Sequence, residues 1–207
     1  MTGPLGPPDE DFPDVSVGSR TALSVTLGLL AIFVLAFWVT GMGRAAPGPA
    51  LLASAALAAS LILLSYMDLR TGLLLDAVTL PLIAAGLAWA VLFTGAWVQA
   101  LAGAALGYGL IAGLAAYWRK TRGYEGIGLG DAKLLAGGGA WVGVMGLPVI
   151  LLIASILGLL AGIFVSSAPQ SRQARPALPF GPCLGIGIWI VWCLTNVGLF
   201  NQSVPGT

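Results

Sequence analysis

Beyond its first 20 residues this chain has only four carboxylates, which are Asp68, Asp76, Glu125 and Asp131. It has no histidine, so catalysis by a histidine base and a histidine-ligated zinc site are both excluded. A carboxylic acid can still exchange protons with a substrate or a water molecule. These four acids are therefore the first candidates for chemistry in the body of the chain.

Two of the four acids stand at the ends of apolar runs. Asp68 follows the run SLILLSYM, and Asp131 precedes the run AKLLAGGG. In a membrane both would lie where hydrocarbon meets water, and burying a carboxylate there is costly unless it has a function. A structural explanation is also open, because an acid that opens a helix can cap its N–H groups, and Asp68 or Asp76 could pair with Arg70.

The composition is typical of a protein that spans a bilayer. Of the 207 residues, 58% are hydrophobic and 8% are charged, and the mean hydropathy is +0.96, whereas a soluble domain has about 25% charged residues. Because about 20 apolar residues cross one hydrocarbon core, we expect an all-α, polytopic bundle of six to seven transmembrane segments. The expected segments lie near residues 22–41, 48–67, 77–97, 99–118, 131–146, 147–166 and 180–200.

The segment 131–146 is the weakest of these, because it is short and rich in glycine, and we expect it to be broken or partly buried. Glycines four residues apart predict close helix packing. Such pairs are Gly103 with Gly107, Gly109 with Gly113, and Gly158 with Gly162. The Trp and Tyr residues favour belts at the membrane interfaces.

Three regions are expected along the chain. Residues 1–20 are rich in proline and acids and predict a disordered cytoplasmic tail, 21–200 form the membrane domain, and 201–207 are a short tail. Cys183 and Cys193 lie ten residues apart without the close spacing of a metal site, so we expect packing side chains and no metal. Nine Lys or Arg against eight Asp or Glu give no indication of a nucleic-acid partner.

The basic residues predict the orientation. Eight fall on one side of the expected segments and only Arg44 on the other, which is a strong positive-inside bias. The eight are Arg20, Arg70, Arg119, Lys120, Arg122, Lys133, Arg172 and Arg175. All four carboxylates should then face the cytoplasm, and the carboxyl terminus should face outward.

Glycines at 126, 128 and 130 precede Asp131. Glycine allows positive φ and a close backbone approach, which suits a loop that lays an extended peptide beside a carboxylate. The stretch Gly128-Leu129-Gly130-Asp131-Ala132-Lys133-Leu134-Leu135 resembles the Gly-x-Gly-Asp motif of the type IV prepilin peptidases, which are membrane aspartyl proteases. Asp68, the step of eight residues to Asp76, and Thr79-Leu80-Pro81-Leu82 extend the resemblance.

The resemblance covers roughly residues 48–200, because Leu178-Pro179-Phe180-Gly181-Pro182 is similar to the segment that opens the family's last helix. Two departures stand out. Many members have proline before the acid that corresponds to Asp76, whereas this chain has Leu75. Bifunctional members carry an insert with paired Cys-x-x-Cys motifs and methylate the new amino terminus. This chain resembles the short, peptidase-only form without the methyltransferase domain, for which we expect no cofactor.

The resemblance implies that Asp68 and Asp131 are the catalytic residues. Two carboxylates a few ångströms apart cannot both ionise readily, so one keeps a proton while the other acts as base on a shared water. The sequence leaves open which one holds the proton. Supporting or substrate-positioning roles are expected for Gly128, Gly130, Lys133, Asp76 and Glu125.

The alternatives for three of these residues stay open. Lys133 either orients the substrate near the scissile bond or snorkels toward lipid phosphate. Asp76 either caps the helix that begins with Ala77 or meets a basic leader peptide. Glu125 either meets that leader or is a solvated loop acid.

The sequence thus predicts an aspartic endopeptidase that cleaves the basic leader of type IV prepilins or pseudopilins, as in type IV pilus or type II secretion systems. It would act at the cytoplasmic face of a bacterial inner membrane, with the lipid bilayer and the precursor as its partners and no oligomeric state indicated. One alternative is a small proton-coupled transporter, which would need acids near mid-membrane and inverted repeats. Another is a presenilin-like protease, whose first aspartate usually follows Tyr directly, whereas Met67 intervenes here.

Cysteine labelling checks the orientation. In a variant whose Cys183 and Cys193 are replaced by Ala, Arg44→Cys should react with a membrane-impermeant maleimide added outside intact cells. Arg122→Cys should react only after the membrane is opened, because the positive-inside rule keeps it in the cytoplasm. Labelling of position 122 from outside would contradict the orientation.

Overall fold

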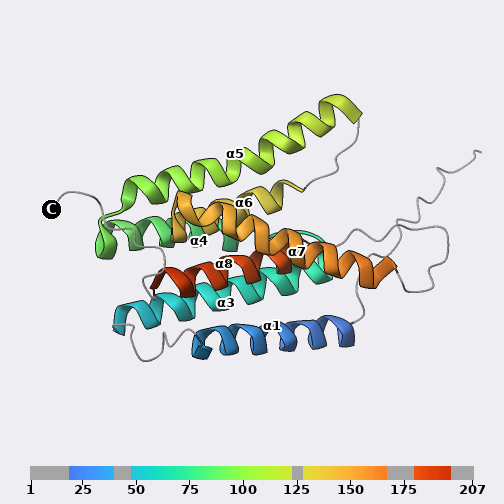
Figure 1. Ribbon diagram of the computed structural model, residues 1–207, viewed down its shortest axis with the longest axis horizontal. Coiled ribbons are helices and arrows are strands. Elements are labelled where there is room, and N and C mark those ends of the chain that lie inside the picture. The colour runs from blue at the N-terminus through green and yellow to red at the C-terminus, as the bar shows by residue number, and fades with distance from the viewer. Residues whose placement is uncertain (1–18, 40–47, 123–127, 167–179, 197–207) are drawn as a thin grey trace, which may run out of the picture.

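The computed structural model describes residues 19–39, 48–122, 128–166 and 180–196. Across these ranges the chain is helical and has no strand, so the expected all-α bundle is confirmed. Its elements are α1 (Ser19–Val39), α3 (Gly48–Thr71), α4 (Asp76–Trp89), the π-helical turn η1 (Ala90–Thr94), α5 (Trp97–Arg122), α6 (Leu129–Val142), the 3-10 turn η2 (Val144–Gly146), α7 (Leu147–Ser166) and α8 (Gly181–Asn196). Successive helices run in opposite directions along the long axis (Figure 1).

Each expected segment overlaps one of these helices, and α1, α3, α4, α5 and α6 extend beyond the expected bounds at one or both ends. Four stretches are long and apolar enough to cross a membrane, namely Gly48–Thr71, Asp76–Thr94, Trp97–Thr121 and Val144–Ile163. The stretches Thr26–Trp38 and Gly181–Asn196 are apolar but shorter. The chain is therefore a multi-pass membrane protein.

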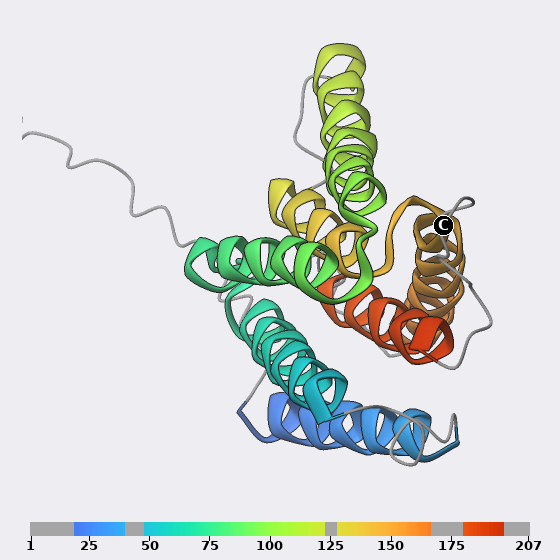
Figure 2. The same ribbon diagram turned by 90° about the vertical axis from the view of Figure 1, so that its left-hand side faces the viewer.

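Helix α6 occupies the middle of the bundle. It packs against α4, α5 and α8, and the view along the helices places it between them (Figure 2). Its residues from Leu134 to Val142 are all buried. At Gly143, with φ at 74°, the helix ends and η2 leads into α7. The expected short, broken segment at 131–146 is thus observed, and it is more deeply buried than the sequence indicated.

Glycine allows α5 to cross α6 at backbone contact. A Cβ atom on Gly103 would collide with the carbonyl oxygen of Gly139, and one on Gly139 would collide with the carbonyl oxygen of Gly103. One turn along α5, a Cβ on Gly107 would lie 2.7 Å from the carbonyl oxygen of Leu135. The predicted packing role is therefore confirmed for Gly103 and Gly107.

The other two glycine pairs behave differently. A Cβ on Gly109, Gly113 or Gly162 would meet nothing within 4 Å, whereas one on Gly158 would touch the Phe180 ring at 3.1 Å. The prediction of close packing is wrong for Gly109 and Gly113. They lie on a face of α5 that no other described helix covers at these positions, and spacing alone does not say which helix face meets a neighbour.

Three of the tryptophans are part of the core. Trp141, Trp189 and Trp192 are at most 7% exposed, and each indole N–H has a partner. Trp141 donates to the carbonyl oxygen of Leu82, Trp189 to that of Phe33, and Trp192 to the hydroxyl of Ser54, each at 2.9 Å. For these three the expected interfacial belt is wrong, because an internal acceptor satisfies the indole N–H away from the membrane surface.

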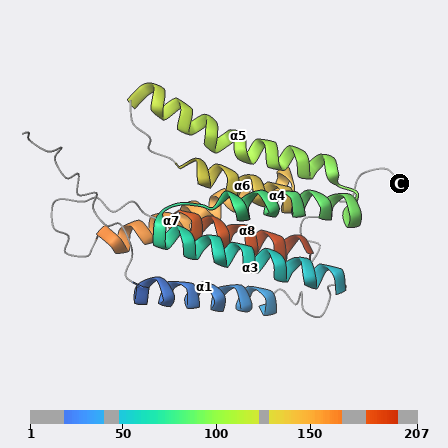
Figure 3. The same ribbon diagram turned by 180° about the vertical axis from the view of Figure 1, so that it is seen from behind.

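Helix α1 forms an outer layer of the bundle. Helix α1 packs against α3 and α8, and it lies at the edge of the bundle beside α3 (Figure 3). Trp189 on α8 stacks on Phe33 of α1 with ring centroids 5.2 Å apart. Helix α3, which carries Asp68, is therefore held between α1 and α8.

The backbone contact between α5 and α6 can be tested with one methyl group. Gly103→Ala should lower the free energy of unfolding by about 1–3 kcal/mol, because the methyl group has only backbone to push against. Gly109→Ala is the matched control on the same helix, since it brings the same gain in helix propensity into open space. Thermal unfolding in detergent measures both variants, and equal midpoints would contradict the crossing.

Candidate active site

Three elements bring their ends together at one end of the bundle. Helix α3 ends just after Asp68, α6 begins just before Asp131, and α8 begins at Gly181. Since successive helices run in opposite directions, these three ends lie on the same side (Figure 1). The fold thus gathers two predicted site residues, Asp68 and Asp131, from distant parts of the sequence.

Asp68 is buried and held by α8. The residue is only 7% exposed. Its Oδ2 accepts a hydrogen bond of 2.9 Å from the backbone N–H of Gly181. The first N–H groups of a helix have no partner within that helix and favour a negative charge. The start of α8 therefore fixes one oxygen of the Asp68 carboxylate.

Gly181 leaves the space that this hydrogen bond needs. A Cβ atom at this position would lie 2.6 Å from Oδ2 of Asp68 and 2.9 Å from its carboxyl carbon. In the sequence Gly181 belongs to the segment that resembles the start of the family's last helix, and no role is predicted for it. The signal that could have found it is a glycine directly before Pro182, because proline favours the first turn of a helix and a glycine there leaves the helix end open to a side chain.

Asp131 lies in the first turn of α6 and is half-buried. Its backbone N–H donates to the carbonyl oxygen of Gly128 at 3.2 Å. The Asp68 carboxylate is close enough to act on it electrostatically, and Cys183 of α8 is within electrostatic reach of both acids. The two acids and Cys183 are therefore near enough to influence one another electrostatically at this end of the bundle.

Two glycines of the motif have different surroundings. Gly128 precedes α6 in an extended conformation with φ at −71°, which any residue can adopt. At Gly130 a Cβ would lie 2.9 Å from Cδ1 of Leu74. The neighbour of Gly130 is thus a side chain of the loop before α4, and the expected approach of an extended peptide stays a prediction. The expected positive φ is wrong for both, since in the described ranges only Gly72, Gly95 and Gly143 have it.

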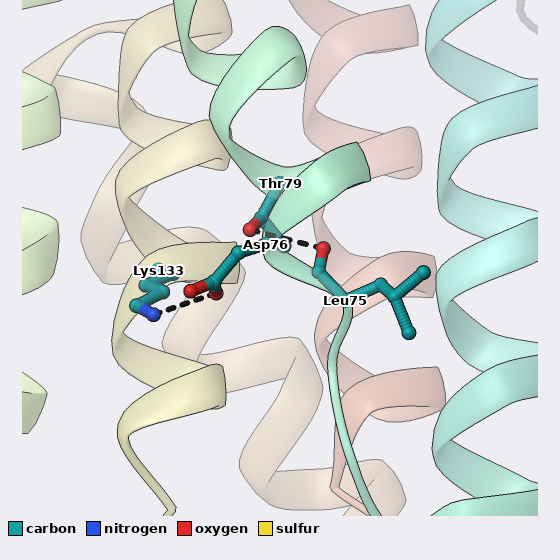
Figure 4. Close-up of polar contacts among 4 residues, drawn as sticks. All are labelled: Leu75, Asp76, Thr79 and Lys133. Atoms are coloured by element: carbon teal, nitrogen blue, oxygen red, sulfur yellow. Dashed lines mark hydrogen bonds and ion pairs between the residues drawn. The ribbon is translucent and has the colours of Figure 1, made fainter.

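Lys133 and Asp76 form an ion pair beside this region. The Lys133 Nζ donates to Oδ1 of Asp76 at 2.6 Å, with side chains 30% and 57% exposed, as Figure 4 shows. Asp76 is the first residue of α4, and the residue before it, Leu75, makes no side-chain capping bond. The capping role considered for Asp76 is therefore wrong, because its carboxylate reaches across to α6.

At the start of α4, backbone N–H groups and the Thr79 hydroxyl bond to the Leu75 carbonyl oxygen, so these N–H groups need no carboxylate cap. Thr79 donates its Oγ1 hydrogen to the carbonyl oxygen of Leu75 at 3.3 Å (Figure 4).

Arg70 lies 5.9 Å from the centre of the Tyr66 ring and forms no ion pair with Asp68 or Asp76. The interfacial pairing considered for Arg70 is therefore not observed. Glu125, with Gly126, lies outside the residues that the structure describes.

In the part of the chain that is described, no group of three or more His, Cys, Asp or Glu could hold a metal ion. Cys183 and Cys193 are both buried, so they are packing side chains within the bundle. What the end of the bundle offers chemically is a pair of carboxylates, one fixed by a backbone amide and one at the start of a helix.

The sequence profile of the type IV leader peptidase family matches residues 55–163. The chain belongs to this family. The matched range contains Asp68, Asp76, Asp131 and Lys133 and ends before Gly181. The family assignment therefore rests on the region that carries both acids.

Curated relatives agree with this assignment. A prepilin leader peptidase/N-methyltransferase of Aeromonas hydrophila is 36% identical over 193 residues, which are 86% of this chain and 65% of the relative. Proteins of the same name from Burkholderia pseudomallei and Pseudomonas putida are 39% and 41% identical, over 83% and 63% of this chain and 53% and 46% of their own lengths. The chain thus spans about half to two thirds of these family members. No solved structure matches.

The contact between Gly181 and Asp68 yields a test. For the peptidase activity proposed below, Gly181→Ala should lower the rate of substrate cleavage roughly 100-fold, because the methyl group would displace a carboxylate whose position matters to within about 1 Å. Gly113→Ala, whose methyl group meets open space, should keep the wild-type rate. A prepilin cleavage assay on purified protein in detergent makes the comparison, and a fully active Gly181→Ala variant would contradict the geometry.

Proposed function

We propose that this chain is an aspartic endopeptidase that removes the leader peptide from type IV prepilins or pseudopilins. The observation that carries the proposal is the placement of Asp68 and Asp131 at the same end of the bundle, within electrostatic reach of each other, in a chain of the type IV leader peptidase family. The name of the relatives, prepilin leader peptidase/N-methyltransferase, supports the substrate class. That name also includes a methyltransferase, and the proposal for this chain is limited to the peptidase.

Asp68 and Asp131 are proposed to work as one unit. Two neighbouring carboxylates share a proton, so one can activate a water molecule as base while the other protonates the carbonyl oxygen of the scissile bond. When the tetrahedral intermediate collapses, the roles are exchanged. The Gly181 hydrogen bond to Asp68 supports this mechanism, because a carboxylate with one oxygen fixed directs its other oxygen in a defined direction.

The surroundings suit a substrate that is apolar on one side of its cleavage site. Leu73, Leu75 and Leu129 lie close in sequence to the acids and are 68%, 43% and 46% exposed. Gly128 is proposed to let the extended peptide pass close to Asp131, because it presents backbone without a side chain and, among the described residues, only Asp131 Oδ2 and the Gly130 nitrogen come within 4.0 Å of an added Cβ. Gly130 is proposed to support the site through its contact with the Leu74 side chain. Asp76 is already paired with Lys133, so a basic leader would have to compete for that charge.

The proposed location is a bacterial inner membrane, with the acids facing the cytoplasm. Six basic residues of the described chain belong to the helix ends on the same side as Asp68 and Asp131, namely Arg20, Arg70, Arg119, Lys120, Arg122 and Lys133. This grouping is what the positive-inside rule requires of a cytoplasmic face. Membership of the leader peptidase family favours the peptidase over the transporter and the presenilin-like protease.

Isosteric removal of the acids tests the proposal. Asp68→Asn and Asp131→Asn should each abolish leader removal from a co-expressed prepilin, because an amide cannot exchange the proton that the pair shares. The acidic residue Glu10 of the amino-terminal segment provides a matched control, and Glu10→Gln should process at the wild-type rate. Immunoblots of precursor and mature pilin report the result. Normal processing by either aspartate variant would show that the pair is not the catalytic unit.

A further inference from the structure

Asp68 and Asp131 belong to helices that barely touch each other. Helix α3 packs against α8, α1 and α4, while α6 packs against α5, α4, α8 and α7, and no extensive contact joins α3 to α6. The distance between the two carboxylates therefore depends on α4 and α8, the two helices that contact both. On the α8 side, Gly181 holds Asp68 directly. The α4 side has no such contact with either carboxylate.

The connection through α4 begins at α3. The segment 72–75 is the whole link between these helices, and its first residue, Gly72, donates its N–H to the carbonyl oxygen of Asp68 at 2.8 Å. At its other end the N–H groups of Val78 and Thr79 donate to the carbonyl oxygen of Leu75 at 3.0 and 3.1 Å. The start of α4 is thus tied to the turn that carries Asp68.

Two contacts extend this connection to α6. The Leu74 side chain packs against Gly130, and Asp76 binds Lys133, two residues beyond Asp131. The last residue of this first turn, Ala132, is fully buried, whereas the start of the turn is more exposed. Gly128 before it supplies no side-chain cap, and Leu129 is 46% exposed. The ion pair therefore closes a short path from Asp68 through α4 to Asp131.

We propose that Asp76 and Lys133 are a positioning pair that holds Asp131 in register with Asp68. They act through the first turn of α6 and do not contact the substrate. The inference rests on the proposed peptidase function of the two aspartates. Because both side chains are partly exposed, the pair adds little to the stability of the whole protein, and its effect is expected in the geometry of the acids.

A double-mutant cycle on the full chain tests this role. Asp76→Asn and Lys133→Gln should each lower kcat on a prepilin peptide roughly 10- to 100-fold, with KM within about twofold, because a small misplacement of one acid slows the chemical step. The double variant should be no slower than the slower single variant, since either change already breaks the pair. Lys120→Gln, which removes an exposed cation at the same end of the bundle, should change neither constant. Lys133→Arg, which keeps the charge, should retain most of kcat.

Hydrogen exchange gives a readout that does not need activity. In both single variants and in the double variant, amides of the first turn of α6 should exchange about two- to fivefold faster, since an exposed ion pair stabilises local structure by only a small amount. The middle of α6 and the Lys120→Gln protein should exchange as the wild type does. Unchanged exchange in the first turn would overturn the proposal.

Other outcomes separate this inference from the proposed function. A rise in KM for Lys133→Gln that persists in the Asp76→Asn background would show that Lys133 contacts the substrate, which would overturn the positioning role. Should the wild-type chain cleave no prepilin, or the Asp68→Asn chain cleave normally, the proposed function fails. The exchange measurement would still decide whether the pair holds the first turn of α6.

Discussion

A buried carboxylate is tolerated in an apolar bundle only where a donor meets it, and in this protein the donor is the first N–H of α8. The hydrogen bond from Gly181 to Asp68 joins the start of α8 to the last turns of α3. It requires a glycine, because any side chain at position 181 would occupy the space of the carboxylate. This contact holds the start of α8 against Asp68, while the packing of α8 against α3, α6 and α7 holds the rest of the helix.

A second constraint acts on α6, which is too short and too glycine-rich to be an ordinary span. Gly103 and Gly139 let α5 cross α6 at backbone contact, and Gly138 accepts the side chain of Ile188 from α8. Without side chains on these faces, three helices can surround α6 closely. This packing places the first turn of α6, which carries Asp131, at the same end of the bundle as Asp68.

The site therefore combines elements from the whole described chain. The range that matches the family ends at residue 163 and includes both acids, while the amide that holds Asp68 comes from residue 181. The Asp76–Lys133 ion pair adds a third connection at the surface. A buried hydrogen bond thus connects the acids to α8, and an exposed ion pair connects their surroundings to α4.

The sequence by itself determined the membrane class, the places of the helices and the identity of the two acids. Apolar runs of bilayer length, separated by short polar stretches, allow little else. Asp68 and Asp131 are distinguished from the other two carboxylates by their places at the ends of apolar runs and by the resemblance of the surrounding residues to the Gly-x-Gly-Asp family. The tertiary structure alone decided which partners these residues have. That Gly181 meets Asp68, that Lys133 binds Asp76 and that Trp192 donates to Ser54 depends on contacts between helices far apart in the chain. Residue spacing within one helix sets which side chains share a face, and it contains no information about which other helix packs against that face.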